Sequence, residues 1–268
     1  MLWWLLACRP PPEAPAEVGA LGRFLFAHFE DEEPDELVAG IDNLVMRLAT
    51  EDFRTSVADR AVGMPVLRPE DLGPLSLPNG TSADDQVGVA ASGISAFPLV
   101  DQLRLITDPI QTCIESSNTT WAGRTFESDP DCFPTDCDRL VTGNEVRRES
   151  LLARVWYDQP KVYRAVRSSS DVEVMVGRAH IDRIFEGDGG SNAWRQLFQL
   201  DVFVDDGDQT LRWFASWTEV DVTGLGDDLL ANLVISGIEE ALGFGDELLG
   251  NAELSCPHDR DAPRPDRE

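Results

Sequence analysis

The residues best suited to acid–base chemistry are Arg178, His180 and Asp182, which alternate along a strand-like stretch of sequence. Side chains two residues apart in a strand share a face. A carboxylate beside a histidine orients the ring and raises its pKa, so the three residues could form a general acid–base site. The same alternation also describes the polar outer face of a half-buried strand. We favour that second interpretation because it is the ordinary pattern of such strands.

Other catalytic motifs are missing from the sequence. The closest match to G-x-S-x-G, at residues 93–97, ends in Phe97 and lacks the final glycine that the sharp nucleophile turn prefers. The chain also has no H-E-x-x-H motif, no phosphate-binding glycine loop and no dinucleotide fingerprint. The sequence therefore predicts a protein that is not an enzyme and needs no cofactor, with an enzyme built on His180 and Asp182 as the weakest alternative.

The cysteines point to an oxidising compartment. An odd number in an exported protein leaves one thiol to be explained, and four that remain can form two disulfides. We expect Cys132–Cys137 to close a local loop and Cys113–Cys256 to fasten the C-terminal tail. The fifth cysteine, Cys8, then needs another role.

Zinc and calcium sites are the alternatives to these disulfides. Zinc binding would use the same cysteines, but the chain has no C-x-x-C pair and only three histidines. The clustered aspartates of residues 129–138 suggest calcium, yet they lack the order of an EF-hand loop. We therefore expect a solvated disulfide loop and no metal.

Cys8 follows Leu5, Leu6 and Ala7 and precedes a proline-rich stretch. This arrangement resembles the lipobox of bacterial lipoproteins, in which the cysteine becomes the lipidated first residue of the mature protein. The resemblance implies a signal-peptide remnant at residues 1–7, a flexible tether at 8–20 and a membrane partner reached through the lipid anchor. It places the protein in the cell envelope, periplasmic or extracellular. Arg9 in place of aspartate mildly favours the outer membrane.

The composition predicts a folded and strongly acidic protein. The chain has 268 residues, is 42% hydrophobic and carries a formal net charge of −27, which excludes nucleic acid as a partner. Lys161 is its only lysine, beside 21 arginines. High-GC coding and an adaptation to high salt both explain that bias, and we prefer the first.

The pattern of apolar residues predicts one α+β domain over residues 21–250. Leu37, Ile41, Leu44 and Leu48 recur at helical spacing after an acidic, proline-containing start. A Pro/Gly-rich loop (63–80) and a cysteine-rich loop (113–140) follow, then an antiparallel sheet and a long C-terminal helix starting at Asp227-Asp228 and ending at Gly243 and Gly245. We expect a polar tail at 251–268, ordered at most as far as Cys256.

The last strand is apolar on both faces. Trp213 and Trp217 share one face, whereas Phe214 lies on the other, so something must cover each side of the sheet. The C-terminal helix is the expected cover for one side. The N-terminal helices, a ligand and a partner are the alternatives for the other. A change of apolar phase at Gly177 suggests a bulge.

The order of elements over residues 150–250 is similar to that of helix-grip proteins of the START and polyketide-cyclase type. That resemblance implies a cavity between the sheet and the last helix, with Trp213, Trp217 and Phe214 as candidate lining residues. The leading hypothesis is a lipid-anchored binding or envelope-structural module that meets an envelope protein. The alternative is a carrier of a hydrophobic small molecule such as a lipid.

Overall fold

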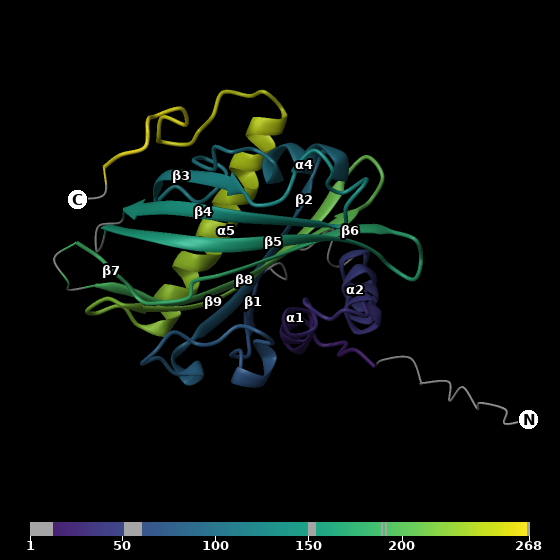
Figure 1. Ribbon diagram of the computed structural model, residues 1–268, viewed down its shortest axis with the longest axis horizontal. Coiled ribbons are helices and arrows are strands. Elements are labelled where there is room, and N and C mark those ends of the chain that lie inside the picture. Colours follow the sequence, from purple (N-terminus) through teal and green to yellow (C-terminus); the bar gives the residue numbers. More distant parts are fainter. Residues whose placement is uncertain (1–12, 51–60, 150–153, 189, 191, 267–268) are drawn as a thin grey trace, which may run out of the picture.

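The computed structural model describes residues 13–50, 61–149, 154–188, 190 and 192–266. In these ranges it has four α-helices and one nine-stranded sheet (Figure 1). The helices are α1 (Val18–Ala27), α2 (Asp35–Leu48), α4 (Leu99–Ile106) and α5 (Asp227–Leu249). The strands are β1 (Ala61–Met64), β2 (Val87–Ser95), β3 (Thr119–Phe126), β4 (Arg139–Glu149), β5 (Arg154–Arg167), β6 (Glu173–His180), β7 (Phe185–Glu186), β8 (Ala193–Asp205) and β9 (Thr210–Asp221).

All strand pairs in the sheet are antiparallel, in the order β1-β2-β9-β8-β6-β5-β4-β3, with β7 paired to β8. The β8–β9 hairpin turns at Gly207, whose φ of 76° is the left-handed conformation that Asp-Gly turns use. The predicted α+β class, with an antiparallel sheet packed against a long C-terminal helix, is confirmed.

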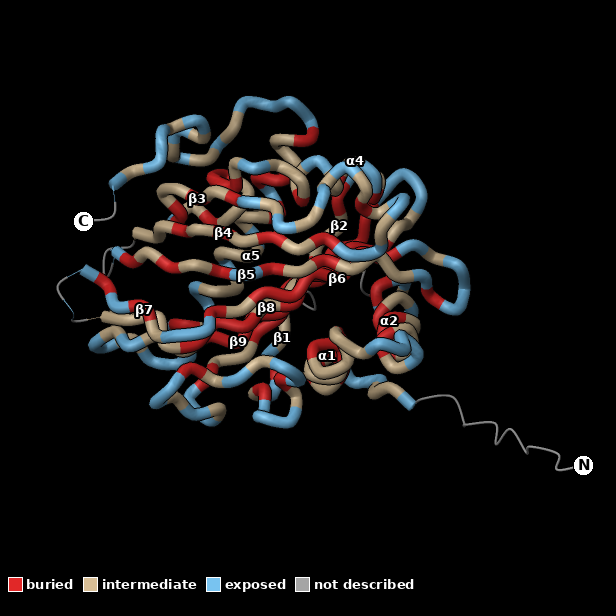
Figure 2. The backbone as a smooth tube through the Cα atoms, viewed as in Figure 1, coloured by how far each residue is buried: buried red, intermediate tan, exposed pale blue. Residues whose placement is uncertain are grey.

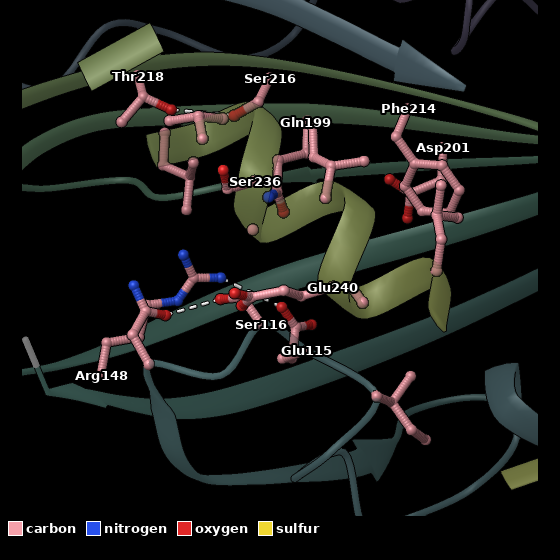
Figure 3. A pocket seen from close by; sticks show the side chains of 18 of the residues that line it. Glu115, Ser116, Arg148, Gln199, Asp201, Phe214, Ser216, Thr218, Ser236 and Glu240 are labelled. Atoms are coloured by element: carbon pink, nitrogen blue, oxygen red, sulfur yellow. Dashed lines mark hydrogen bonds and ion pairs between the residues drawn. The ribbon is translucent and has the colours of Figure 1, made fainter. Parts of the chain in front are cut away.

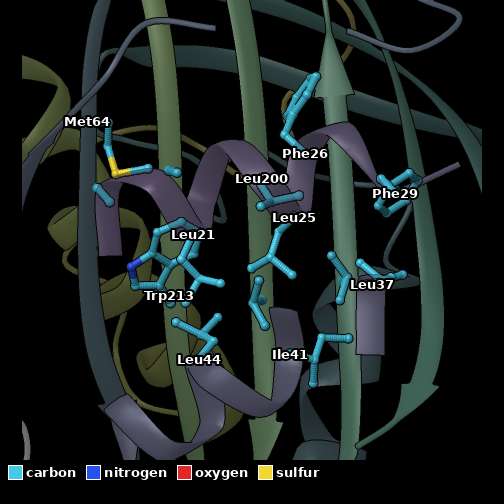
Figure 4. Packing of buried hydrophobic residues seen from close by; sticks show 14 of the residues in the cluster. Leu21, Leu25, Phe26, Phe29, Leu37, Ile41, Leu44, Met64, Leu200 and Trp213 are labelled. Atoms are coloured by element: carbon cyan, nitrogen blue, oxygen red, sulfur yellow. The ribbon is translucent and has the colours of Figure 1, made fainter. Parts of the chain in front are cut away.

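Helices α1 and α2 cover one face of the sheet (Figures 1 and 4). The predicted stripe on α2 is fully buried there. Gly22 lets α1 lie close to the sheet, since a Cβ at this position would stand 2.8 Å from the ring of Trp213. Figure 2 shows the buried positions gathered in the central strands and under these helices. The N-terminal helices are therefore the cover of the second face that the sequence left open.

Helix α5 covers the opposite face and is longer than predicted. It does not stop at Gly243 or Gly245 but continues to Leu249. Phe244 and Leu249 are buried, so packing overrides the low helix propensity of glycine. Gly245 also has a packing role, because a Cβ there would lie 3.0 Å from Leu105 of α4.

The cysteines pair as predicted, Cys113 with Cys256 and Cys132 with Cys137. The tail does not end its contacts at Cys256. His258 Nε2 lies 2.7 Å from the carbonyl oxygen of Ser117, and Arg264 pairs with Glu145 at 2.7 Å. The expectation that order stops at Cys256 is thus wrong, because side chains beyond the disulfide hold the tail to the domain.

Several predicted boundaries shift. Helix α1 begins at Val18, inside the predicted tether of 8–20, and Asn43 of α2 donates hydrogen bonds to the carbonyl oxygens of Ala14 and Pro15. Residues 1–12, including Cys8, lie outside the described residues. The 63–80 loop is less irregular than predicted, since it includes the end of β1 and a short 3₁₀ turn, Pro69–Asp71.

The predicted bulge at Gly177 is absent, since β6 pairs with β5 and with β8 without a register shift. Within the described ranges, no helix combines the length and the apolar character needed to span a membrane.

Phe26 tests the packing of the helical layer. Its ring is fully buried and makes edge contacts with Phe198 and Trp217, at centroid distances of 5.9 and 5.5 Å. We expect Phe26→Ala to lower the free energy of unfolding by about 3–5 kcal/mol in urea denaturation. Met46→Ala on α2, at a residue 63% exposed, should change it by less than about 0.5 kcal/mol. Equal losses in the two variants would contradict this packing.

Candidate functional site

A cavity of about 630 Å³ lies between the sheet and α5 (Figure 3). It is lined by α4, α5, strands β3, β4, β5, β8 and β9, and the segment of residues 111–118. The cavity occupies the face of the sheet opposite to α1 and α2. The sheet, α4, α5 and this segment therefore position most of the side chains of the candidate site.

Strand alternation decides which residues of β9 reach the cavity. Phe214 lines it, together with Arg212, Ser216 and Thr218. Trp213 and Trp217 alternate with these residues and lie in the core under α1 and α2. Of the three predicted lining residues only Phe214 is therefore in place. The prediction that Trp213 and Trp217 line the cavity is wrong, because the face of β9 that carries both tryptophans packs against α1 and α2.

The two walls of the cavity differ in character. The β8 and β9 wall is mixed and includes the polar residues Gln199, Asp201 and Arg212, whereas α5 contributes an apolar stripe. The stripe consists of Leu229, Leu230, Leu233, Val234, Ile238 and Leu242. Leu229 and Leu233 are each 51% exposed, so the cavity meets solvent at the beginning of α5.

Lys161 of β5 forms a buried ion pair with Asp201 of β8, across the intervening strand β6. The strands of a sheet are about 4.8 Å apart, so the pair spans two strand spacings. It does so over Gly177 and Ala179, the small residues that lie between the two on β6. A Cβ at Gly177 would stand 2.7 Å from the ring of Tyr163, so this glycine provides space rather than a bulge.

Lys161 and Asp201 each favour the charged form of the other. Burial is the largest single effect on Lys161 and disfavours its charged form, but Asp201 and other neighbours together outweigh it and the pKa of Lys161 is raised. Burial raises the pKa of Asp201, and the attraction of Lys161 opposes the shift. An ion pair of this kind costs desolvation energy and gives the cavity a fixed polar end.

Helix α5 is attached to the sheet by an ion pair. Arg212 contacts both carboxylate oxygens of Asp246 at 3.0 Å and also donates to the carbonyl oxygen of Leu242. Ser95 of β2 donates to the same carboxylate at 2.6 Å. Burial lowers the pKa of Arg212, and Asp246 opposes that shift. The second half of α5 is thereby fixed over the sheet.

The segment of residues 111–118 forms a side wall. Glu115 pairs with Arg148 of β4 at 3.1 Å, and the backbone N–H of Ser117 donates to Glu240 of α5 at 2.9 Å. Figure 3 shows Glu115, Ser116, Arg148 and Glu240 together on one side of α5. The Cys113–Cys256 disulfide joins this segment to the tail. The predicted staple thus lies beside the candidate site.

The predicted acid–base residues lie elsewhere. Arg178 and His180 are on the face of β6 that α1 covers, and Arg178 pairs with Glu30 at 2.6 Å. Burial and the neighbouring Arg178 lower the pKa of His180, and Asp182 opposes the shift only in part. Within the described residues, no hydrogen bond joins His180 to Asp182, and neither lines the cavity. This arrangement gives Arg178 a structural role and offers no acid–base site.

The cysteines that could have bound zinc are not available as ligands. Cys132 and Cys137 are bonded to each other and are not free thiolate ligands. In the part of the chain that the structure describes, no group of three or more His, Cys, Asp or Glu side chains is arranged to hold a metal ion.

No protein-family model and no curated protein matches the chain. Solved structures do resemble it. A STAR-related lipid transfer protein from Xanthomonas axonopodis has a TM-score of 0.45 and 9% identity, covering 66% of this chain and 91% of that one. A START superfamily protein from Mycobacterium smegmatis has a TM-score of 0.38 and 12% identity, covering 61% and 97%. The Zhui aromatase/cyclase from Streptomyces has a TM-score of 0.37 and 8% identity, covering 60% and 94%.

At these TM-scores the likenesses carry no argument about what the cavity binds, and the site is argued from its own residues. Lys161 and Asp201 were not predicted from the sequence as residues of the site. A signal for them existed, because each is a charged residue placed inside a strand between apolar neighbours, and Lys161 is the only lysine. Charged residues at such positions are buried only when paired.

The ion pair can be tested by a double-mutant cycle. Removing one partner leaves a buried charge, so Lys161→Met and Asp201→Asn should each lower the free energy of unfolding by about 3–5 kcal/mol. The double variant should lose less than the sum of the two. Urea denaturation with the disulfides intact measures this. As a control, Arg183→Met breaks a pair whose side chains are 61% and 45% exposed and should cost about 0–1 kcal/mol. Additive losses at Lys161 and Asp201 would contradict a coupled pair.

Proposed function

We propose that this protein binds a hydrophobic or amphipathic small molecule in the cavity between the sheet and α5. The observation that carries the proposal is the cavity itself, with about 630 Å³ of space. Small-molecule sites have volumes of about 300–1,000 Å³, mostly apolar walls and a few placed polar groups. A well-packed protein interior leaves few voids larger than a water molecule, so a space of this size calls for an occupant.

The exposed leucines of α5 support the same proposal. Leu229 and Leu233 line the cavity and remain half exposed, although the chain has ample polar surface. An apolar ligand lying along α5 would cover part of these side chains, at a gain of about 25 cal/mol for each Å² removed from water. Binding would therefore remove from water apolar surface of these leucines that is exposed in the unliganded chain.

Fluorescence of N-phenylnaphthylamine, a neutral apolar probe, tests the proposal on the full chain. We expect enhanced emission and saturable binding of one probe per chain. Ala241→Trp places a large ring in the cavity. This ring should weaken probe binding at least about tenfold, because it takes up space that the probe would occupy.

Asn232→Trp is the matched control, because Asn232 lies on the exposed side of the same helix and does not line the cavity. It should bind the probe like the unaltered chain, and both variants should melt near the same temperature. Absence of saturable binding, or equal binding by Ala241→Trp, would overturn the proposal.

We also propose that the protein is exported and anchored through lipidated Cys8. The four cysteines of the described residues pair with each other, so by count Cys8 has no cysteine of this chain left to pair with. The two disulfides support an oxidising compartment, which agrees with the lipobox-like sequence. Anchoring would hold the cavity close to a membrane, where apolar ligands concentrate.

Mass spectrometry of the protein from a bacterial membrane fraction tests the anchor. We expect the mature chain to begin at Cys8 with added acyl mass, and Cys8→Ser to move the protein to the soluble fraction. Ligand binding by the Cys8→Ser protein should be unchanged, because Cys8 precedes the described domain. An unmodified Cys8 in the membrane-associated protein would overturn the anchoring proposal and leave the binding proposal intact.

A further inference from the structure

Arg124 of β3 is a buried cation that lines the cavity, with 6% of its surface exposed. Its Nε donates to Asn144 Oδ1 at 2.8 Å, its Nη2 to the hydroxyl of Tyr163 at 3.3 Å, and its Nη1 to the carbonyl oxygen of Ile106. All three acceptors are neutral. The bonds fix the guanidinium in place and leave its charge uncompensated.

The other basic side chains that line the cavity have carboxylate partners. Arg148 pairs with Glu115, Lys161 with Asp201, and Arg212 with Asp246. The remaining lining carboxylate, Glu240, accepts from the backbone N–H of Ser117. Within the described ranges, Arg124 has no carboxylate at ion-pair distance.

Lys161 lies close to Arg124, and both face the same aromatic ring. The guanidinium carbon of Arg124 is 5.5 Å from the centroid of the Tyr163 ring, and Lys161 Nζ is 5.1 Å from it. Asp201, already bonded to Lys161, also interacts electrostatically with Arg124. Two cations thus share one carboxylate, and this end of the cavity carries a net positive charge inside a chain whose net charge is −27.

The positive end lies at α4, away from the apolar opening. Arg124 contacts Ile106 at the end of α4, and Gly245 in the second half of α5 packs on the same helix. The apolar opening at Leu229 and Leu233 belongs to the first turns of α5. The cavity therefore runs along α5 from an exposed apolar mouth to a buried cationic end.

An uncompensated buried charge is costly, and a carboxylate or another planar anion fits the donor fork of arginine. From the geometry we infer that the ligand is an anionic amphiphile with its acidic group against Arg124 and its apolar part along α5 toward Leu229 and Leu233. This inference rests on the proposed function and adds the class of the ligand and its direction in the cavity.

Competition between two matched ligands tests the inference on the full chain. Dodecanoate and dodecanol share an alkyl chain and differ in charge at about pH 8, well above the pKa of about 4 of a carboxylic acid. Each is titrated against bound N-phenylnaphthylamine. We expect dodecanoate to bind about 10- to 100-fold more tightly than dodecanol, the ratio that a charge-assisted hydrogen bond supplies.

Substitutions identify the group responsible. Arg124→Gln should abolish the preference for dodecanoate over dodecanol, and its melting temperature reports whether the variant is folded. Arg124→Lys keeps the charge without the fork and should retain an intermediate preference. The control is Arg104→Gln, which removes one exposed positive charge from α4 and should preserve the full preference.

The outcomes separate the two proposals. Equal binding of dodecanoate and dodecanol by the unaltered chain, or a preference for dodecyltrimethylammonium, would overturn the anionic class while the binding function stands. A preference that survives Arg124→Gln would overturn the role of Arg124. If Arg124→Gln does not fold, the preference of the unaltered chain and the intermediate value of Arg124→Lys decide the question. Failure of every ligand, including N-phenylnaphthylamine, would overturn the proposed function itself.

Discussion

The packing of α1 and α2 on one face of the sheet is the constraint on which the rest of the structure depends. One face of β8 and β9 is largely apolar and buried under these helices, and β6 adds Val174 and Val176 to it. Burial of that face supplies the hydrophobic stabilisation of the domain. The other face of the same strands can then carry Asp201, Arg212 and Gln199, which line the cavity. Packing on one face of the sheet thus stabilises the fold, and the other face can line a cavity although the net stability of a folded protein is small.

The hollow side depends on how α5 is held. A helix laid over a cavity lacks the continuous packing that fixes α1 and α2, and polar contacts take over that role. Arg212 and Asp246 attach its second half to the sheet, and Glu240 attaches its middle to the segment of residues 111–118. The first turns make fewer such contacts and expose Leu229 and Leu233. These polar attachments therefore hold the middle and the second half of α5, away from the mouth of the cavity.

The sequence was sufficient to predict the fold class, the antiparallel sheet, the long last helix and both disulfides. Periodicity and the close spacing of Cys132 and Cys137 are local signals, and once that pair is assigned Cys113 and Cys256 remain to pair with each other. It misplaced Trp213 and Trp217, since alternation assigns residues to two faces but does not say which face is hollow. It also ended α5 at Gly243, because glycine marks a helix end only where tertiary packing does not decide. Lys161 and Asp201 meet across β6, and that contact depends on a sheet order that local patterns do not give. Arg124 went unnoticed for the same reason.

The burial of Lys161 has a consequence for the surface of the whole protein. It is the only lysine, so every other basic side chain except the three histidines is a guanidinium. Guanidinium groups keep their charge at all ordinary pH values and do not undergo acylation, methylation or ubiquitination at an ε-amine. The exterior therefore offers no side-chain amine to enzymes or reagents.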